Sequence, residues 1–274
     1  MNLTVNHSGL LEITSIQSGE PNSLNDSYDS VIDMKIGKYR VEKKICDGGM
    51  AVVYSAVRID EHFTRRVAIK FIKRGMDTEE IIKRFKIEQQ TLAGLNHPYI
   101  AKIIDGGTTE SGLPYFVMEL IEGEPIDKYC RNKNLSVIEK LKLFQKVCSA
   151  IQYAHQNLII HRDIKPGNIF VTSDGTPKLL DFRIAKLLNI SDAQTNLTRT
   201  GFRVMTLEYA SPEQLKGEQI TTSTDIYSLG IVLYEILTGN FPYKFNNTLP
   251  YEVERVICTT EPQKPSTAVR NIHR

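Results

Sequence analysis

The sequence predicts an α+β fold built from a small β-rich lobe and a larger, mainly helical lobe. Three strand-like segments rich in β-branched and aromatic residues follow one another between residues 39 and 72, and helical periodicity dominates beyond residue 121. The chain has 274 residues, of which 41% are hydrophobic, so it can bury a substantial core. We therefore expect one domain over residues 38–274, with lobes of about 38–121 and 122–274.

The β-rich lobe is expected to follow a flexible N-terminal extension. Residues 1–37 mix Ser, Asn, Asp and Gly with isolated apolar residues and show no sustained period. From residue 39 onward, the segments YRVEKKI, AVVYSAV and RRVAIKFI are separated by glycine or polar turns. This pattern predicts three consecutive strands, and two more strands are expected around the glycine-rich turn of IIDGGTTESGLPYFVMEL.

A helix is predicted between these two groups of strands, over residues 77–95. Asp77 and Glu80 have the spacing of a capping box at its start. Apolar residues then recur at helical spacing, and they are Ile82, Phe85, Leu92 and Leu95. The pattern indicates a helix with one apolar stripe.

The larger lobe is expected to begin with a second helix, in the segment SVIEKLKLFQKVCSAIQYAH. Ser136 and Glu139 again have the spacing of a capping box. The apolar stripe predicted for this helix consists of Ile138, Leu141, Phe144, Cys148 and Ile151.

Composition and charge argue against several classes of function. The formal net charge is +2, whereas proteins that bind nucleic acids or membranes usually carry a concentrated basic face. The four cysteines include no C-x-x-C pair, so neither a zinc site nor a disulfide framework is indicated. The longest apolar run, around LGIVLYEIL, is about half of what a bilayer requires, and the N-terminus lacks a secretion signal pattern. We expect a cytoplasmic protein with no membrane segment and no nucleic acid partner.

The strongest chemical signal is the segment IIHRDIKPGNIFV. Asp163 can accept a proton from a hydroxyl group, Lys165 can neutralise charge on a phosphoryl group, and Asn168 can hold a metal ion. The apolar segment KLLDF follows and delivers Asp181, a carboxylate suited to a magnesium ion that bridges nucleotide phosphates. Residue types in this order predict phosphoryl transfer.

Two weaker signals lie upstream. The glycine-containing turn in ICDGGMAVVYSA could bring backbone N–H groups close to phosphates, although an ordinary hairpin turn fits it equally well. Lys70, in the segment VAIK, is spaced so that it can meet Glu88 on the following helix. Taken alone, an isolated lysine on a strand is usually just solvated.

From about residue 39 onward, the chain resembles the Hanks-type (eukaryotic-like) serine/threonine protein kinases, and most closely their bacterial members. The similarity continues through TLEYASPEQ and TTSTDIYSLGIVLYEILTG, so it covers nearly the whole chain after the extension. It implies a bilobal protein kinase fold, truncated before the last helices of the larger lobe. It also implies ATP and Mg²⁺ as cofactors and a protein substrate with a Ser or Thr acceptor, since Lys165 and Thr206 match the serine/threonine branch.

The resemblance also assigns roles to individual residues. The nucleotide-binding set it implies is Ile45, Gly48, Val53, Ala68, Lys70, Glu88, the gatekeeper Met118, the hinge from Glu119 to Ile121, and Phe170. Asp163, Lys165 and Asn168 would be catalytic, and Asn168 and Asp181 would hold the metal. Leu92, His161 and Phe182 would stack as a regulatory spine, which favours a packing role for His161 over that of a base.

Regulation is implied in the segment TNLTRTGF. In this family, an arginine at the position of Arg162 gathers a phosphorylated activation segment through charge-assisted hydrogen bonds. Thr198 and Thr200 match the phosphorylated positions, although they could also be plain polar loop residues. Self-association for autophosphorylation fits the same interpretation.

The sequence departs from the family pattern at several positions. Cys46 and Ala51 replace the outer glycines of the phosphate turn, and Arg183 stands where glycine normally follows the Asp-Phe pair. The arginine that would pair with Glu213 belongs to a helix beyond residue 274, although Arg270 or Arg274 could substitute. Two functions therefore stay open, an active kinase and a pseudokinase scaffold. A dinucleotide-binding enzyme is a distant third, because no G-x-G-x-x-G opens a helix.

We predict that Arg183→Gly increases the rate of phosphate transfer and lowers the magnesium concentration required. Glycine restores backbone freedom next to Asp181 and removes a cation that competes with magnesium for the same carboxylate. Measuring the transfer rate against magnesium concentration for both chains tests this expectation. An unaltered curve would show that Arg183 does not impair the metal site.

Overall fold

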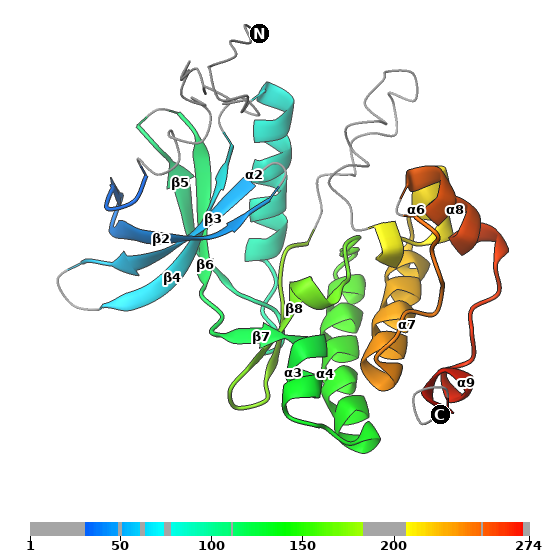
Figure 1. The fold of residues 1–274 in the computed structure, drawn as a ribbon. Coiled ribbons are helices and arrows are strands. Elements are labelled where there is room, and N and C mark those ends of the chain that lie inside the picture. Colours follow the sequence, from blue (N-terminus) through cyan, green and yellow to red (C-terminus); the bar gives the residue numbers. More distant parts are fainter. Residues whose placement is uncertain are drawn as a thin grey trace, which may run out of the picture.

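The computed structural model describes residues 31–48, 51–60, 64–73, 78–110, 112–182, 207–247 and 249–270, apart from the side chains of Glu80, Arg84 and Arg270. Figure 1 shows a small lobe built on a β-sheet with one helix against it, and a larger lobe that is mostly helical. The two-lobed α+β architecture predicted from the sequence is therefore confirmed.

The sheet of the small lobe has six antiparallel strands in the order β1-β2-β3-β4-β6-β5. The bounds of the strands are Lys35–Ile36 (β1), Tyr39–Asp47 (β2), Ala51–Arg58 (β3), Arg65–Ile72 (β4), Ile103–Thr108 (β5) and Pro114–Glu119 (β6). All five predicted strands are present. β1 was not predicted, because two residues are too few to show an alternating pattern.

The two faces of this sheet have different roles. Alternate residues of four strands form one buried cluster, to which β3 contributes Val52, Tyr54 and Ala56. Since side chains alternate across a strand, Val53 of β3 and Lys70 of β4, which are register partners, lie on the opposite face. The strand pattern thus sends one set of residues to the core and the other set towards the junction of the lobes.

The beginning of the chain differs from the expectation in one respect. Residues 1–37 were predicted to be a flexible extension, whereas Lys35 pairs with Arg40 and Ile36 with Tyr39 in the sheet. Residues 1–30 lie outside the described part of the chain. The sheet therefore begins three residues before residue 38. The boundary of the domain itself stays a prediction.

Helix α2 (Glu79–Ala93) packs against β5 and β6. Its Phe85 lies against Phe116 of β6, with the ring centroids 5.0 Å apart. The N-cap is Thr78, whose side chain accepts a hydrogen bond from the backbone N–H of Ile81, so the predicted start at Asp77 was one residue early. Asp77 itself lies outside the described residues.

The larger lobe combines helices with a three-stranded sheet. Its helices are α3 (Ile126–Asn132), α4 (Val137–Gln156), α6 (Pro212–Lys216), α7 (Thr222–Thr238), α8 (Pro250–Thr259) and α9 (Pro265–Arg270). The sheet contains β7 (Gly123–Pro125), β8 (Ile169–Thr172) and β9 (Pro177–Leu179), in that order. α4 and α7 pack side by side at the centre of the lobe (Figure 1). Within the described residues, no helix is both long and apolar enough to cross a bilayer.

A single hydrophobic cluster joins the two lobes. It contains Leu92 from the last turn of α2, Leu95 just after that helix, Val147 and Ile151 from α4, and Val232 from α7. Because α2 belongs to the small lobe and α7 to the larger one, this cluster connects the position of α2 to the centre of the helical lobe.

The capping box predicted at the start of α4 is confirmed, because Ser136 and Glu139 bond reciprocally across the first turn. The predicted stripe was wrong at its N-terminal end. Ile138 and Leu141 are 66% and 45% exposed, and the buried face consists of Leu143, Phe144, Val147, Ala150, Ile151 and Ala154. Periodicity identified the helix but not which of two neighbouring stripes the rest of the chain covers.

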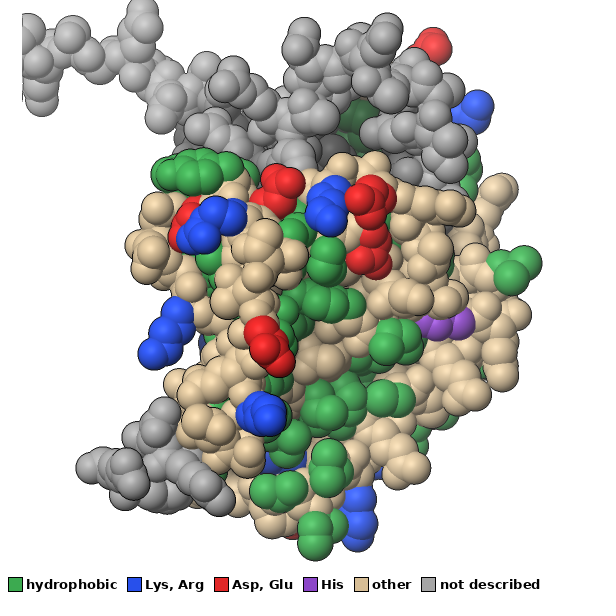
Figure 2. All heavy atoms as spheres, turned by 90° about the vertical axis from the view of Figure 1, so that its right-hand side faces the viewer, with side chains coloured by type: hydrophobic (Ala, Val, Ile, Leu, Met, Phe, Trp, Pro, Cys, Tyr) green, Lys and Arg blue, Asp and Glu red, His purple; other side chains and the backbone are tan. Residues whose placement is uncertain are grey.

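Figure 2 shows the face of the molecule that carries α8 and α9. Hydrophobic side chains reach the surface there, and the described chain has exposed large apolar residues at Ile226, Leu249 and Tyr251. Lysine and arginine side chains are scattered among acidic ones on this face. The described part of this face thus offers no concentrated basic surface of the kind that nucleic acids bind.

We predict that Ile151→Ala lowers the free energy of unfolding by about 2–5 kcal/mol, because it leaves a cavity in the shared core. The matched substitution Ile138→Ala, on the same helix, should change it by less than about 0.5–1 kcal/mol, because Ile138 is exposed. Urea denaturation of both variants measures the difference. Equal losses would show that the buried face of α4 is assigned wrongly.

Candidate active site

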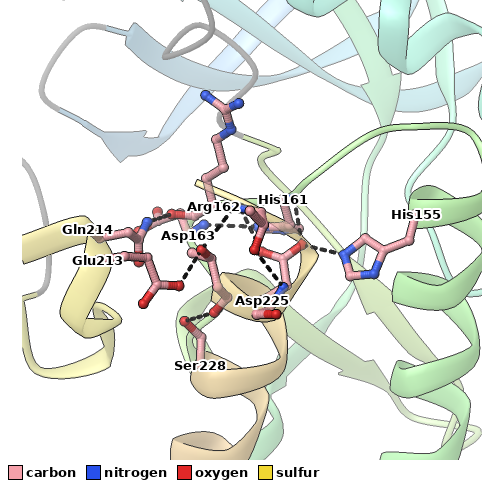
Figure 3. A network of polar contacts seen from close by, with 11 residues as sticks. His155, His161, Arg162, Asp163, Glu213, Gln214, Asp225 and Ser228 are labelled. Carbon is pink, nitrogen blue, oxygen red and sulfur yellow. Dashed lines mark hydrogen bonds and ion pairs between the residues drawn. The ribbon is translucent and has the colours of Figure 1, made fainter. Parts of the chain in front are cut away.

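Asp225, in the first turn of α7, anchors the loop that carries Asp163. The Asp225 carboxylate accepts hydrogen bonds from the backbone N–H groups of His161 and Arg162, at 2.8 and 2.9 Å. It also lies 2.8 Å from Nε2 of His155 on α4 (Figure 3). Asp225 is 1% exposed, so these contacts satisfy a carboxylate that has almost no access to water.

Arg162 is fixed in a backbone conformation that a side chain disfavours. Its φ is 67°, in the left-handed region, which costs about 1–2 kcal/mol for a residue other than glycine. Asp225 binds its N–H, and the side-chain amide of Gln214 donates to its carbonyl at 2.9 Å. The strain is therefore held by contacts to Gln214 of α6 and Asp225 of α7.

The Arg162 side chain extends away from Asp225 in Figure 3. It is buried, and its Nε has no hydrogen-bond partner among the described residues. Burial lowers the pKa of the guanidinium, although the Asp225 carboxylate acts in the opposite direction. A buried guanidinium N–H of this kind is suited to an anion.

Asp163 is held by two residues of its own loop. The Asn168 side-chain amide donates to the Asp163 carboxylate at 3.0 Å and to its backbone carbonyl at 2.7 Å. Lys165 Nζ lies 3.3 Å from the same carboxylate oxygen. The structure thus brings together the three residues that the sequence selected as catalytic.

His161 is fully buried next to this loop. Its Nε2 lies 2.8 Å from the Leu180 carbonyl and its Nδ1 accepts from the backbone N–H of Asp163, so the ring is a neutral Nε2–H tautomer. Burial lowers the pKa of His161, which agrees with that assignment. The ring packs on Phe182 with centroids 4.4 Å apart, and Phe182 shares its buried cluster with Leu92. These contacts fit packing and loop support.

Lys70 joins the small lobe to the catalytic face of the larger one. Its Nζ lies 3.1 Å from Oε1 of Glu88 on α2 and 3.1 Å from Oδ1 of Asp181 after β9. The predicted meeting of Lys70 with Glu88 is confirmed. Burial would lower the pKa of Lys70, but the two carboxylates outweigh it and raise this pKa above its ordinary value. The two carboxylates therefore favour the charged form of the lysine.

The Asp181 carboxylate and the side-chain oxygen of Asn168 are ligands of the type that divalent cations bind. The backbone N–H of Leu180 donates to the Asn168 carbonyl at 2.9 Å, which brings Asn168 next to Asp181. The Asn168 amide nitrogen is used by Asp163, which leaves its side-chain oxygen as an acceptor. Mg²⁺ usually takes few protein oxygens and completes its shell with phosphates and water. The described residues contain no group of three or more His, Cys, Asp or Glu side chains that could hold a metal ion.

The expected nucleotide contacts come from strands of both lobes. Val53 and Ala68 are buried in the sheet, Ala68 pairs in register with Met118, and Phe170 lies on β8 in the larger lobe. Ile45 is exposed on β2, and the Gly48 N–H donates to the Ala51 carbonyl at 3.0 Å. These positions are compatible with a nucleotide, and their roles stay predictions.

The chain matches the protein kinase domain family model over residues 39–271. It belongs to the protein kinase family. Relatives include the serine/threonine-protein kinase PknA of Mycobacterium tuberculosis, 37% identical over 235 residues, with 84% of this chain and 52% of PknA covered. PrkC of Bacillus subtilis is 37% identical over 252 residues, covering 84% of this chain and 38% of PrkC. The probable kinase PknB of Lactococcus lactis is 40% identical over 210 residues, covering 75% of this chain and 32% of PknB. The chain thus spans about half or less of the length of these relatives.

Several predicted positions lie outside the described residues of this protein kinase domain. They are Arg183, Thr198, Thr200, Thr206 and Arg274, together with the side chain of Arg270. Glu213 is described, and Thr224 donates to its carboxylate at 2.6 Å. Burial alone would raise the pKa of Glu213, but this hydrogen bond helps to keep it below its ordinary value. A hydroxyl group, which the sequence did not suggest, therefore supports this carboxylate.

The sequence analysis also missed Asp225, because its partners lie more than 60 positions away along the chain. A signal was nevertheless present. An acidic residue in the first turn of helix α7, whose remaining residues are mostly apolar or uncharged, requires a partner once it is buried.

We predict that Asp225→Asn destabilises the kinase domain by about 1–3 kcal/mol, because a single amide oxygen replaces two carboxylate oxygens under two buried N–H groups. Amide hydrogen exchange at His161 and Arg162 should accelerate selectively. His155→Gln should cost less, since both backbone hydrogen bonds to Asp225 remain. Unchanged protection of the two amides in Asp225→Asn would contradict the anchoring role.

Proposed function

We propose that this domain transfers the γ-phosphoryl group of ATP to Ser or Thr hydroxyls of protein substrates. The main support is the meeting of two sets of residues across the lobes. Lys70 and Glu88 come from the small lobe, and Asp163, Asn168 and Asp181 come from the larger one. Positioning and electrostatic stabilisation supply most of the catalysis in phosphoryl transfer, so this arrangement matches what the reaction needs.

Asp163 would orient the acceptor hydroxyl and accept its proton. The amide of Asn168 and the ammonium of Lys165 both contact its carboxylate, so its direction is fixed before a substrate arrives. Lys165 would also neutralise charge on the phosphoryl group during transfer. Protein kinases of the serine/threonine branch carry a lysine at this position, which supports a Ser or Thr acceptor.

Lys70 would bind the phosphates while Glu88 holds it in place. Asp181 and the side-chain oxygen of Asn168 would hold Mg²⁺, which would neutralise negative charge on the phosphates. The Asp181 carboxylate also contacts Lys70, and the Asp181 side chain is 41% exposed. We infer that this contact keeps the Asp181 carboxylate directed towards the phosphate-binding lysine.

Regulation through the activation segment is a further part of the proposal. The unpartnered Nε of buried Arg162 supports an anion in this region, and phosphorylated Thr198 or Thr200 would provide one. Autophosphorylation by a second copy would supply that phosphate. A cytoplasmic location is proposed because the four cysteines are free and unpaired with one another.

A scaffold without transfer activity is the alternative. Cys46 and Ala51 at the phosphate turn and Arg183 after the Asp-Phe pair favour it. A pseudokinase that binds nucleotide would share the Lys70 contacts, so binding alone does not separate the two functions. A measurement of phosphate transfer separates them.

We predict that the chain transfers phosphate from labelled ATP and that Asp163→Asn lowers the rate by about 10²–10⁴-fold, the usual contribution of a general base. The variant should still be stabilised by Mg·ATP in a thermal-shift measurement, because Asp163 is not among the expected nucleotide contacts. Label should appear on serine or threonine. Equal transfer by the parent and the Asp163→Asn chains would refute the mechanism, and Mg·ATP stabilisation without transfer by the parent would establish the scaffold.

A further inference from the structure

A second ion pair crosses the junction of the lobes, away from the catalytic residues. Lys178 Nζ of β9 lies 2.9 Å from Oε2 of Glu119, the last residue of β6. The two side chains are 16% and 27% exposed. An ion pair at this depth is less screened by water than a surface pair, so it can contribute to the geometry of the site.

The Glu119 carboxylate joins three segments that are distant in sequence. Its Oε2 accepts from Lys178 and also from the backbone N–H of Lys102, at 3.4 Å, just before β5. The Glu119 N–H in turn donates to the Lys102 carbonyl at 2.9 Å. The residue is thus held through both its backbone and its side chain.

Lys178 lies next to expected residues of the nucleotide site in the larger lobe. It pairs in register with Phe170 of β8, and it lies three residues before Asp181. Val67 and Ala68 of β4 pair with Glu119 and Met118 on the other side. The ion pair therefore connects the strand that leads into the hinge with the strands that carry Phe170 and Asp181.

We propose that Lys178 and Glu119, with the backbone of Lys102, form a hinge clamp that positions the backbone after Glu119 for adenine. The inference rests on the proposed function, because it assigns a role in ATP affinity. Neither side chain needs to touch the nucleotide. A hinge that is already fixed against β8 and β9 loses less conformational freedom when ATP binds, so the clamp increases affinity through preorganisation. Lys178 is accordingly a positioning residue.

The test compares Lys178→Met, Glu119→Gln, their double variant and the charge swap Lys178→Glu with Glu119→Lys. The matched control is Lys216→Met, since Lys216 also pairs with a glutamate, Glu218, but at 4.0 Å and on the exposed surface of α6. The measurements are the Kd of Mg·ATP by calorimetry, the KM for ATP and kcat for transfer, and the melting temperature without nucleotide.

Each single variant should raise the Kd and the KM for ATP by about three- to tenfold, the range expected for one partly buried ion pair. For Lys178→Met, the kcat at saturating ATP should change less than about twofold, because Lys178 is neither a catalytic residue nor an expected nucleotide contact. The double variant should bind no worse than either single variant, and the charge swap should recover part of the affinity. Lys216→Met should bind like the parent.

Other outcomes overturn the clamp. An unchanged Kd in Lys178→Met and Glu119→Gln, with or without a lower melting temperature, would leave the pair a purely structural contact. Additive losses would show that the two residues act separately, and a higher kcat with unchanged Kd would show that the pair restrains the domain. Failure of the parent chain to bind Mg·ATP would instead refute the proposed function, and the clamp with it.

Discussion

The ammonium group of Lys70 lies between two carboxylates that belong to different lobes, and the geometry of the site depends on it. Glu88 reaches it from α2, and Asp181 reaches it from the end of β9, both at 3.1 Å. The two carboxylates outweigh the effect of burial and raise the pKa of the lysine above its ordinary value. The position of α2, fixed by the core that Leu92 and Leu95 share with α4 and α7, therefore sets the position of the phosphate-binding charge.

Asp225 provides a comparable constraint within the larger lobe. Its buried carboxylate binds two consecutive backbone N–H groups and thereby supports the left-handed conformation of Arg162. Asp181, with φ of 51°, is a second residue in that region. Disfavoured conformations at two residues of one site are stored strain, held here by α6, α7 and Lys70. The rigid helices keep the reactive side chains in place before any ligand binds.

Local chemistry made much of this arrangement predictable. The strand segments, the capping box of Ser136 and Glu139, and the meeting of Lys70 with Glu88 all follow from spacing, which the sequence displays directly. Contacts set by tertiary packing were not predictable in this way. Periodicity could not show that Ile138 is exposed, and no spacing rule joins Lys178 to Glu119 or Asp225 to the backbone of Arg162. Such pairs become visible only when the chain is folded.

The central claim is that Lys70, Glu88 and Asp181 belong to one site that binds Mg·ATP. A crystal structure of the chain with Mg²⁺ and a non-hydrolysable ATP analogue tests it most directly. The predicted result is that Lys70 keeps Glu88 and binds phosphate oxygens, while Asp181 turns from Lys70 to a cation shared with the side-chain oxygen of Asn168. A bound nucleotide with Lys70 still on Asp181 and no cation next to that carboxylate would contradict the account.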